Sequence, residues 1–374
     1  MYNNEFIRET SQNQVVFLSD KNSKGKERPW RDKKLKNGLL EDCYLSLARG
    51  DYSGPLYMPN DYYFGKARRL NLCATYLEFK AIMEAEALKL AKGYFCQITL
   101  CPTCSWRKEM KVRVQLGKVV AELVVMDYRF IFLTLTCENV YGDELNDTVD
   151  LLYSAICRLF DLRPVKRAVD GHFRALEITH DAQRKITKKM YCQDKKRKVY
   201  YDSLGLKPGD LNPNFNKYHP HFHVMIAVKP EYFDFKKGLF ISQEKWTDYW
   251  GQSLRADYRP IVDVRAVRNT KDKGILEVAK YSVKDADYII KEDKPLTAEV
   301  VSVLDNALYK RRLIGYAGEM RKVHKRLNLD DEVTADVHLD EEGEEYAKVS
   351  NIVERYHWHV GHKNYVLSRK IIES

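Results

Sequence analysis

The segment KYHPHFHVMIAV, residues 217–228, constrains the fold more strongly than any other part of the chain. Its second half is a run of apolar and β-branched residues, which predicts a strand buried in a hydrophobic core. Because successive side chains of a strand point to opposite faces, His221 and His223 are expected to project together from one face. Two imidazoles placed in this way can hold a divalent cation with little rearrangement.

A carboxylate in the preceding predicted strand favours a metal at this histidine pair. Glu177 lies within FRALEIT, residues 173–179, an otherwise apolar run. An unpaired carboxylate in apolar surroundings costs on the order of several kcal/mol, and a cation held by the histidines would neutralise it. We therefore predict that Glu177 is the third ligand of Mn²⁺ or Mg²⁺, with positions left open for phosphate oxygens. The alternative is a carboxylate that faces solvent at a strand edge.

A second histidine pair in the tail has the same spacing. His357 and His359 lie in YHWHVGHK, with no carboxylate-bearing strand close to them in sequence. Histidines at this spacing are more often structural than metal-binding, so this pair is predicted to be structural or on the surface.

The order of the predicted elements indicates an α+β fold. Strands are predicted from residue 129 (RFIFLTLTC) and over 173–179, 221–228 and 262–267, and helices over 66–92, from Pro102, over 145–162 and over 275–290. This order suits a central antiparallel sheet flanked by helices. The basic stretch 184–198 is predicted to be a long loop between two of the strands.

Four of the eight cysteines are clustered, and they predict a zinc site. They are Cys73, Cys96, Cys101 and Cys104, of which the last two form a CxxC. Clustered cysteines in a chain without a secretory signal favour a metal over disulfides, and a redox or chance CxxC is the alternative. Four thiolates fill a tetrahedral site, so the Zn²⁺ is expected to be structural. Arg107 and Lys108 follow directly and are expected to contact DNA.

The charge of the chain favours a polyanionic partner. The formal net charge is +10, and 25 tyrosines and 14 phenylalanines offer stacking partners for unpaired bases. Basic runs are most often solvated surface, so composition alone makes nucleic acid a favoured partner and nothing more. The sequence has no apolar run long enough to span a membrane and begins without a secretory signal, so a cytoplasmic protein with no membrane partner is expected.

A tyrosine and a glutamate share one face of the last of these predicted helices. Glu277 and Tyr281 are four residues apart. Lys280 and Lys284 form a neighbouring stripe and are expected to contact phosphates. A tyrosine hydroxyl attacks phosphorus only when the phosphate is polarised and the phenolate is stabilised, and a metal with nearby lysines does both. Tyrosines at helical spacing are more often core residues, and Tyr288 on the same face is the rival nucleophile.

Three segments together resemble the HUH endonucleases, and specifically the bacterial initiators of rolling-circle plasmid replication. FLTLTCEN is similar to the first motif of that family, HPHFHVMIAV to its histidine–hydrophobic–histidine strand, and EVAKYSVKDADY to the motif with a single tyrosine. LCPTCSWRKEMK is similar to a cysteine segment of the same plasmid group. The resemblance covers about residues 70–320.

The resemblance implies an HUH-type central antiparallel sheet and a DNA-nicking reaction. Carried over by position, it implies His221 and His223 as metal ligands, with Glu177 as the third. Tyr281 would become linked to the 5′-phosphate and free a 3′-hydroxyl that primes synthesis. Glu277 would promote the hydrolysis that ends the cycle, which spares the enzyme a second tyrosine.

Four segments with different roles are expected. They are a basic flexible arm (1–60), a helical zinc-knuckle DNA-binding segment (61–125), an HUH nicking and strand-transfer domain (126–318), and an acidic, strand-rich tail (319–374). The expected partners are origin DNA, single-stranded or as an extruded hairpin at the nick site, and a host helicase and DNA polymerase. The alternatives are another HUH enzyme such as a relaxase, and a non-catalytic zinc-stabilised DNA-binding protein such as a repressor.

Overall fold

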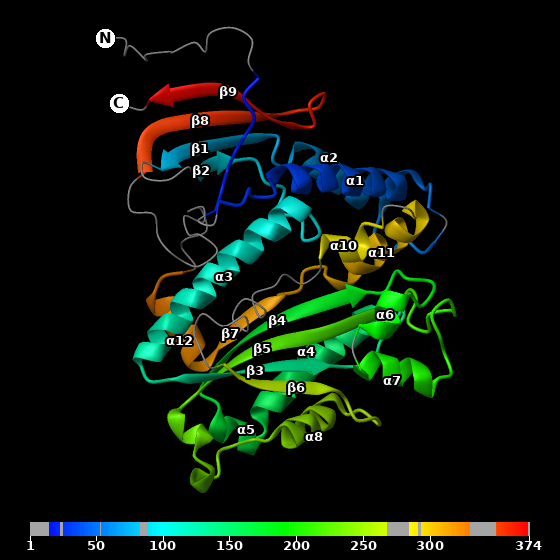
Figure 1. Ribbon diagram of the computed structural model, residues 1–374, viewed down its shortest axis with the longest axis vertical. Helices are drawn as coiled ribbons and strands as arrows, with labels where there is room; N and C mark the ends of the chain where they lie inside the picture. Colours follow the sequence, from blue (N-terminus) through cyan, green and yellow to red (C-terminus); the bar gives the residue numbers. More distant parts are fainter. Residues whose placement is uncertain are drawn as a thin grey trace.

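Two antiparallel β-sheets with flanking helices organise the chain in this computed structural model (Figure 1). The structure describes residues 15–22, 25–52, 54–82, 88–193, 195–267, 284–290, 293–329 and 349–372. The α+β class predicted from the sequence is confirmed. Every helix in these ranges is too short or too polar to cross a lipid bilayer.

The helices surround the two sheets and connect them. They are α1 (Trp30–Arg49), α2 (Asn60–Leu72), α3 (Pro102–Val125), α4 (Leu145–Asp161), α5 (Arg163–Ala168), α6 (Lys188–Cys192), α7 (Lys195–Ser203), α8 (Gln243–Leu254), α10 (Asp285–Tyr288), α11 (Lys294–Ala307) and α12 (Gly318–Arg326), with 3₁₀ turns η1 (Pro230–Phe233) and η2 (Phe235–Lys237). The helix predicted over 145–162 is therefore confirmed as α4, and the one predicted from Pro102 as α3.

The larger sheet contains all the strands predicted before residue 318. They are β3 (Arg129–Thr136), β4 (Gly171–His180), β5 (Tyr218–Val228) and β6 (Val262–Val267), and the short β7 (Ile314–Ala317) joins them. Their order is β6-β3-β5-β4-β7, and all neighbours are antiparallel. β5 is the middle strand, and all its residues except the half-exposed His219 are buried.

Side chains of β5 alternate between two apolar clusters, one on each face of this sheet. Val224 belongs to the cluster that includes side chains of α4 and α8. Met225 belongs to the second cluster, which includes side chains of α3 and α12. His221 and His223 are separated from Met225 by even numbers of residues, so they point to the same face as Met225, the face of α3 and α12.

The smaller sheet joins the two ends of the described chain. Its strands are β1 (Tyr76–Ile82), β2 (Leu88–Gly93), β8 (Val349–His359) and β9 (Asn364–Ile372), in the order β2-β1-β8-β9. β1 and β8 pair along most of their length, from Tyr76 opposite His357 to Ile82 opposite Val349. The tail expected to be rich in strands contains β8 and β9, which pair with β1 and with each other, and α1 and α2 lie beside this sheet (Figure 1).

The helix predicted over 66–92 is wrong beyond Leu72. That stretch is rich in Ala, Leu, Glu and Lys, which have high helix propensity, yet α2 ends at Leu72 and β1 and β2 follow. In β1 Leu77 and Phe79 are fully buried, with the half-exposed Glu78 between them. This period of two, together with the pairing to a strand near the C-terminus, overrides the local propensity.

Two other segments also differ from prediction. The flexible arm expected over 1–60 is wrong for Trp30–Arg49, which form α1, because Leu40, Tyr44 and Leu47 recur on one helical face and are fully buried. The loop predicted over 184–198 contains α6 and part of α7. Of the helix predicted over 275–290, residues 284–290 are described and include α10.

A buried ion pair joins the N-terminal helices to the helices of the larger sheet. Lys66 Nζ of α2 lies 2.6 Å from Oδ1 of Asp305 on α11, and the Asp305 side chain is 2% exposed. Close to this pair, the Tyr63 hydroxyl is hydrogen-bonded to the Ser302 hydroxyl at 3.0 Å. The pKa of Asp305 is raised, because burial outweighs the opposing charge of Lys66. Burial of the Asp305 carboxylate is therefore tolerated only because the Lys66 ammonium lies beside it.

We predict that Lys66→Met destabilises the protein by about 3–5 kcal/mol, because it leaves the Asp305 carboxylate buried without its cation. Urea denaturation followed by circular dichroism measures the free energy of unfolding. The control is Lys66→Met/Asp305→Leu, which removes both charges and should recover most of the lost stability. If Lys66→Met were as stable as the parent protein, the claim that Asp305 needs Lys66 as its buried partner would be contradicted.

Candidate metal centres

The side chains of Glu177, His221 and His223 converge on one point of the larger sheet. Glu177 on β4 lies directly opposite His221 on β5. The Nε2 atoms of the two histidines are 3.2 Å apart, and that of His223 lies 2.8 Å from Oε2 of Glu177. All three residues are buried, and their ligand atoms lie within 4.8 Å of one another. The structure thus brings together the three residues that the sequence predicted to be metal ligands.

Hydrogen bonds to the outer ring nitrogens orient both imidazoles. His221 Nδ1 lies 3.1 Å from the backbone oxygen of His219, which can only accept, so the proton belongs on Nδ1 and Nε2 carries the lone pair. His223 Nδ1 lies 3.3 Å from the hydroxyl of Thr134 on β3. A ligand histidine is typically held by such a second contact. Thr134 lies within the FLTLTCEN motif, but the sequence alone suggested no role for it.

The arrangement of these atoms fits a divalent cation. Lone pairs on two facing nitrogens repel one another unless a proton or a cation lies between them. Nitrogen ligands bind divalent metals at about 2.0–2.1 Å, which puts neighbouring ligand atoms roughly 3 Å apart. The Nε2 atoms of His221 and His223 are separated by 3.2 Å. Two imidazoles and one carboxylate also leave open positions for further oxygen ligands.

Glu177 is buried with its charge partners and does not face solvent. It is 4% exposed, so the alternative of a solvated strand-edge carboxylate does not hold. Burial alone would raise the pKa of Glu177, but the neighbouring imidazoles of His221 and His223 and the charge of Lys284 hold this pKa below its ordinary value. Lys284 Nζ lies 3.0 Å from Oε1 of Glu177, so the predicted phosphate-contacting lysine lies at this site.

The other histidines of the two HxH patterns lie outside the cluster. The His219 ring is half-exposed, with its Nδ1 2.7 Å from the side-chain oxygen of Asn139, and only its backbone oxygen contacts His221. His357 and His359 are exposed on β8. In the described part of the chain they belong to no group with metal-binding geometry.

Only the end of the predicted tyrosine helix can be described. Glu277, Lys280 and Tyr281 lie outside the described residues. The rival Tyr288 is 1% exposed, and its hydroxyl donates to the backbone oxygen of Leu100. A hydroxyl that is buried and already hydrogen-bonded is poorly placed to attack a substrate, so this position does not favour Tyr288 as the nucleophile.

Four cysteines form a second cluster beside the smaller sheet. The Sγ atom of Cys73 lies 3.6 Å from those of Cys101 and Cys104, and that of Cys96 lies 3.7 Å from that of Cys104. All four are free thiols. Metal–sulfur bonds of about 2.3 Å in a tetrahedron put the sulfur atoms about 3.8 Å apart, so the cluster fits a tetrahedral metal site.

Helix α1 supplies two buried polar side chains beside these cysteines. Lys34 Nζ donates to the backbone oxygens of Cys73, at 2.7 Å, and Asn71, at 2.9 Å. The Asn37 side chain contacts the Thr103 hydroxyl at 3.0 Å and Sγ of Cys101 at 3.4 Å. Lys34 and Asn37 are three residues apart and so lie on one helical face. The sequence reveals this shared face only once residues 30–49 are recognised as a helix.

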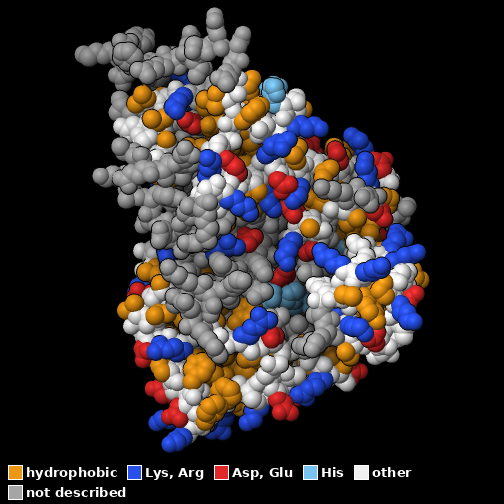
Figure 2. Space-filling view, viewed as in Figure 1, with side chains coloured by type: hydrophobic (Ala, Val, Ile, Leu, Met, Phe, Trp, Pro, Cys, Tyr) orange, Lys and Arg blue, Asp and Glu red, His pale blue; other side chains and the backbone are white. Residues whose placement is uncertain are grey.

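The predicted DNA-contacting residues after the CxxC lie on α3. The Arg107 guanidinium lies 3.4 Å from the centre of the Phe95 ring, and Lys108 is exposed. On the face shown in Figure 2, histidine side chains are visible in a hollow near the middle, with Lys and Arg as well as Asp and Glu side chains around it. The Lys and Arg side chains there are suited to contact with a polyanion.

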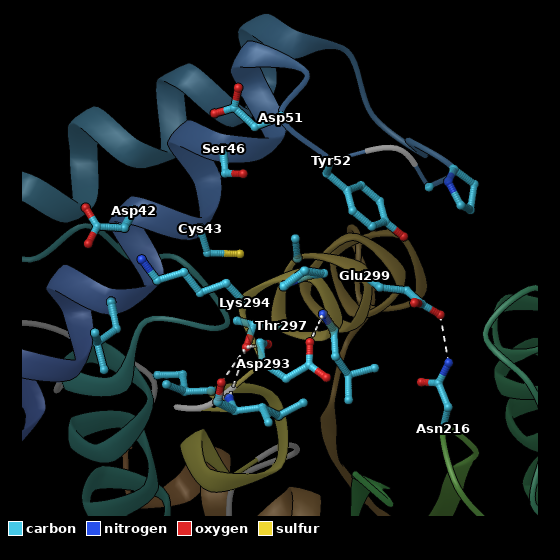
Figure 3. A pocket seen from close by; sticks show the side chains of 18 of the residues that line it. Asp42, Cys43, Ser46, Asp51, Tyr52, Asn216, Asp293, Lys294, Thr297 and Glu299 are labelled. Carbon is cyan, nitrogen blue, oxygen red and sulfur yellow. Dashed lines mark hydrogen bonds between the residues drawn. The ribbon is translucent and has the colours of Figure 1, made fainter. Parts of the chain in front are cut away.

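A separate cavity of about 800 Å³ has a different character (Figure 3). It lies between α1, α11 and the connection from β4 to β5, and its charged lining residues are Asp42, Asp51, Asp293, Glu299, Arg184 and Lys294. Asn216 donates to Glu299 across it at 2.8 Å. Acidic groups outnumber basic ones, which disfavours phosphate, and Glu177, His221 and His223 are not among its lining residues.

The chain is similar to known replication proteins over almost its whole length. Residues 87–366 match the family described as "Replication protein". The chain is 35% identical to "Protein rep" of Bacillus amyloliquefaciens, over 96% of this chain and 99% of that protein. It is 34% identical to "Protein rep" of Streptococcus pneumoniae, over 96% of this chain and 98% of that protein. No solved structure matches it at a significant level.

The family match includes the histidine strand, Glu177, and three of the four clustered cysteines; only Cys73 precedes it. The chain therefore belongs to the Rep family of plasmid replication proteins, the rolling-circle initiators that its motifs resemble.

Proposed function

We propose that the chain nicks one strand of its plasmid origin and transfers the 5′ end to its own Tyr281. The observation that carries the proposal is the convergence of both histidine Nε2 atoms on the Glu177 carboxylate, with Lys284 on the other oxygen of Glu177. A bound Mn²⁺ or Mg²⁺ would polarise the scissile phosphate and stabilise the charge that develops on it. Glu177, His221 and His223 would hold this ion.

In the proposed reaction the Tyr281 hydroxyl oxygen attacks the scissile phosphorus. A phosphorus–oxygen bond to tyrosine forms, and the bond between phosphorus and the 3′-oxygen breaks. The phenol loses its proton and the departing 3′-oxygen gains one, which leaves a 3′-hydroxyl for a host polymerase to extend. Lys284, with its ammonium group beside Glu177, and Lys280 would contact the phosphates on either side of the cut.

Glu277 would end the cycle. A carboxylate one helical turn before Tyr281 can accept the proton of a water molecule that attacks the phosphotyrosyl bond. With attack assigned to Tyr281 and hydrolysis to Glu277, the reaction cycle needs only one tyrosine. Arg107 and Lys108 would add affinity for origin DNA next to a structural Zn²⁺ held by the four cysteines, and a host helicase would open the duplex ahead of the polymerase.

We predict that Tyr281→Phe abolishes the covalent adduct with a single-stranded origin oligonucleotide in Mn²⁺, because only the attacking hydroxyl is removed. Denaturing gel electrophoresis detects the adduct, and fluorescence anisotropy should show almost unchanged affinity for the oligonucleotide. If Tyr281→Phe still formed the adduct, Tyr281 would not be the nucleophile. If the parent protein bound the origin without cutting it, the chain would act as a repressor.

Glu277→Ala is expected to retain nicking but to accumulate the covalent adduct, because the base that activates water has been removed. Adduct decay, chased with excess unlabelled oligonucleotide, measures this step. Equal loss of nicking and of adduct hydrolysis would contradict a role confined to termination.

The metal site is tested by titration calorimetry with Mn²⁺. His221→Ala/His223→Ala should lose Mn²⁺ binding and nicking, whereas His357→Ala/His359→Ala removes a pair of the same spacing and should leave both unchanged. Thr134→Val removes only the hydroxyl beside His223 Nδ1 and should weaken Mn²⁺ binding by about 10-fold or more. Unchanged Mn²⁺ binding after loss of His221 and His223 would refute the site.

A further inference from the structure

We propose that the four-cysteine site has a second task besides stability: through α1 and the loop before Cys101 it positions α10, and with it Lys284, at the nicking site. The inference rests on the proposed function of Glu177, His221 and His223. Helix α10 lies between the N-terminal helices and the larger sheet (Figure 1). It is four residues long, and a helix this short is not stable by itself, so its surroundings determine its position.

The first contact is between α10 and the cysteine loop. The Tyr288 hydroxyl donates to the backbone oxygen of Leu100, the residue immediately before Cys101. Both side chains are buried, Tyr288 at 1% and Leu100 at 2% exposure. Cys96, Cys101 and Cys104 enclose this loop, so a metal held by their thiolates would also fix the carbonyl of Leu100.

The second contact is between α10 and α1. The carboxylate of Asp285 lies 2.6 Å from Lys33 Nζ and 3.3 Å from Lys36 Nζ. The next residues of α1, Lys34 and Asn37, are the ones that contact the cysteine cluster. Helix α1 therefore contacts the cysteine cluster through Lys34 and Asn37, and it contacts α10 through Lys33 and Lys36.

The other side of α10 contacts the nicking site. Lys284, immediately before α10, reaches Glu177 at 3.0 Å. The backbone oxygen of Asp287 lies 3.2 Å from Nδ1 of His180, at the end of β4. Lys284 is thus held in place by a segment that Ile290 anchors to Thr297 of α11 and that Asp285 and Tyr288 anchor to α1 and to the loop before Cys101. Asp285 and Tyr288 are positioning residues, because neither belongs to the candidate metal-binding group of Glu177, His221 and His223.

The test compares two buried tyrosines that make the same bond at different places. Tyr288→Phe deletes the hydrogen bond to Leu100, and Tyr365→Phe deletes the bond from β9 to the backbone oxygen of Ala74, next to Cys73. With a single-stranded oligonucleotide at saturation, we expect Tyr288→Phe to form the adduct about tenfold more slowly, which corresponds to about 1.4 kcal/mol. Oligonucleotide affinity and zinc content should be unchanged, and Tyr365→Phe should react at nearly the parent rate.

Hydrogen–deuterium exchange over residues 284–290 gives a readout that does not depend on nicking. It should become faster in Tyr288→Phe and in Asp285→Asn, remain slow in Tyr365→Phe, and be restored toward the parent rate in Asp285→Glu, which keeps the charge. Cys104→Ser, with its zinc content measured, should also speed exchange in this segment. If the parent protein cut no DNA, the proposed function would fail, and exchange would still decide whether the cysteine site orders α10.

Three outcomes would overturn the inference. The first is a Tyr288→Phe variant that reacts and exchanges like the parent protein. The second is an equal slowing of the reaction in both tyrosine variants, which would indicate general destabilisation. Complete loss of the adduct in Tyr288→Phe, together with its retention in Tyr281→Phe, would make Tyr288 the nucleophile and not a positioning residue.

Discussion

The antiparallel register of β4 against β5 is the constraint on which the candidate site depends. It sets Glu177 directly opposite His221, with His223 on the same face. A slip by one residue would turn the carboxylate to the opposite face. The same strands hold this register through their apolar residues, because Met225 and Ala227 continue the histidine face into the cluster beneath α3 and α12. The alternation along β5 therefore places both the buried core residues and the two candidate histidine ligands.

Burial of a carboxylate and two imidazoles on that face is unfavourable unless their polar atoms are satisfied. Each group has a partner on its outer side: the backbone oxygen of His219 and the hydroxyl of Thr134 for the rings, and the Lys284 ammonium for Glu177. Their inner atoms all point at one another, where two lone pairs and a negative charge meet. A cation resolves this conflict better than a shared proton, since it interacts favourably with all three atoms simultaneously. The same geometry that favours a cation leaves room for further ligands on it.

Elements whose character is encoded in their own residues were predicted from the sequence. Elements and contacts that depend on distant parts of the chain were missed. The strands that carry Glu177 and His221 were found from their short apolar runs, and the helix α4 was found from its helical spacing. β1 was mistaken for helix because its strand character comes from pairing with β8 at the other end of the chain. The convergence of Glu177, His221 and His223 could be predicted from their spacing on strands. Lys34 and Asn37 could not, since nothing in a lysine-rich N-terminal stretch indicates that one of its faces packs against cysteines.

The two ends of the described chain meet around the four cysteines and form one module with them. The N-terminal helices and the C-terminal strands enclose the cysteine cluster, where Tyr365 of β9 donates to the backbone oxygen of Ala74. The buried pair of Lys66 and Asp305 then fixes this module to α11, which follows α10 closely in sequence. The contacts of this module with α10 and with α11 restrict the movement of Lys284 relative to the sheet. Precise placement matters most for a phosphate-contacting group, because the electrostatic stabilisation of a transition state depends on charges that do not have to move.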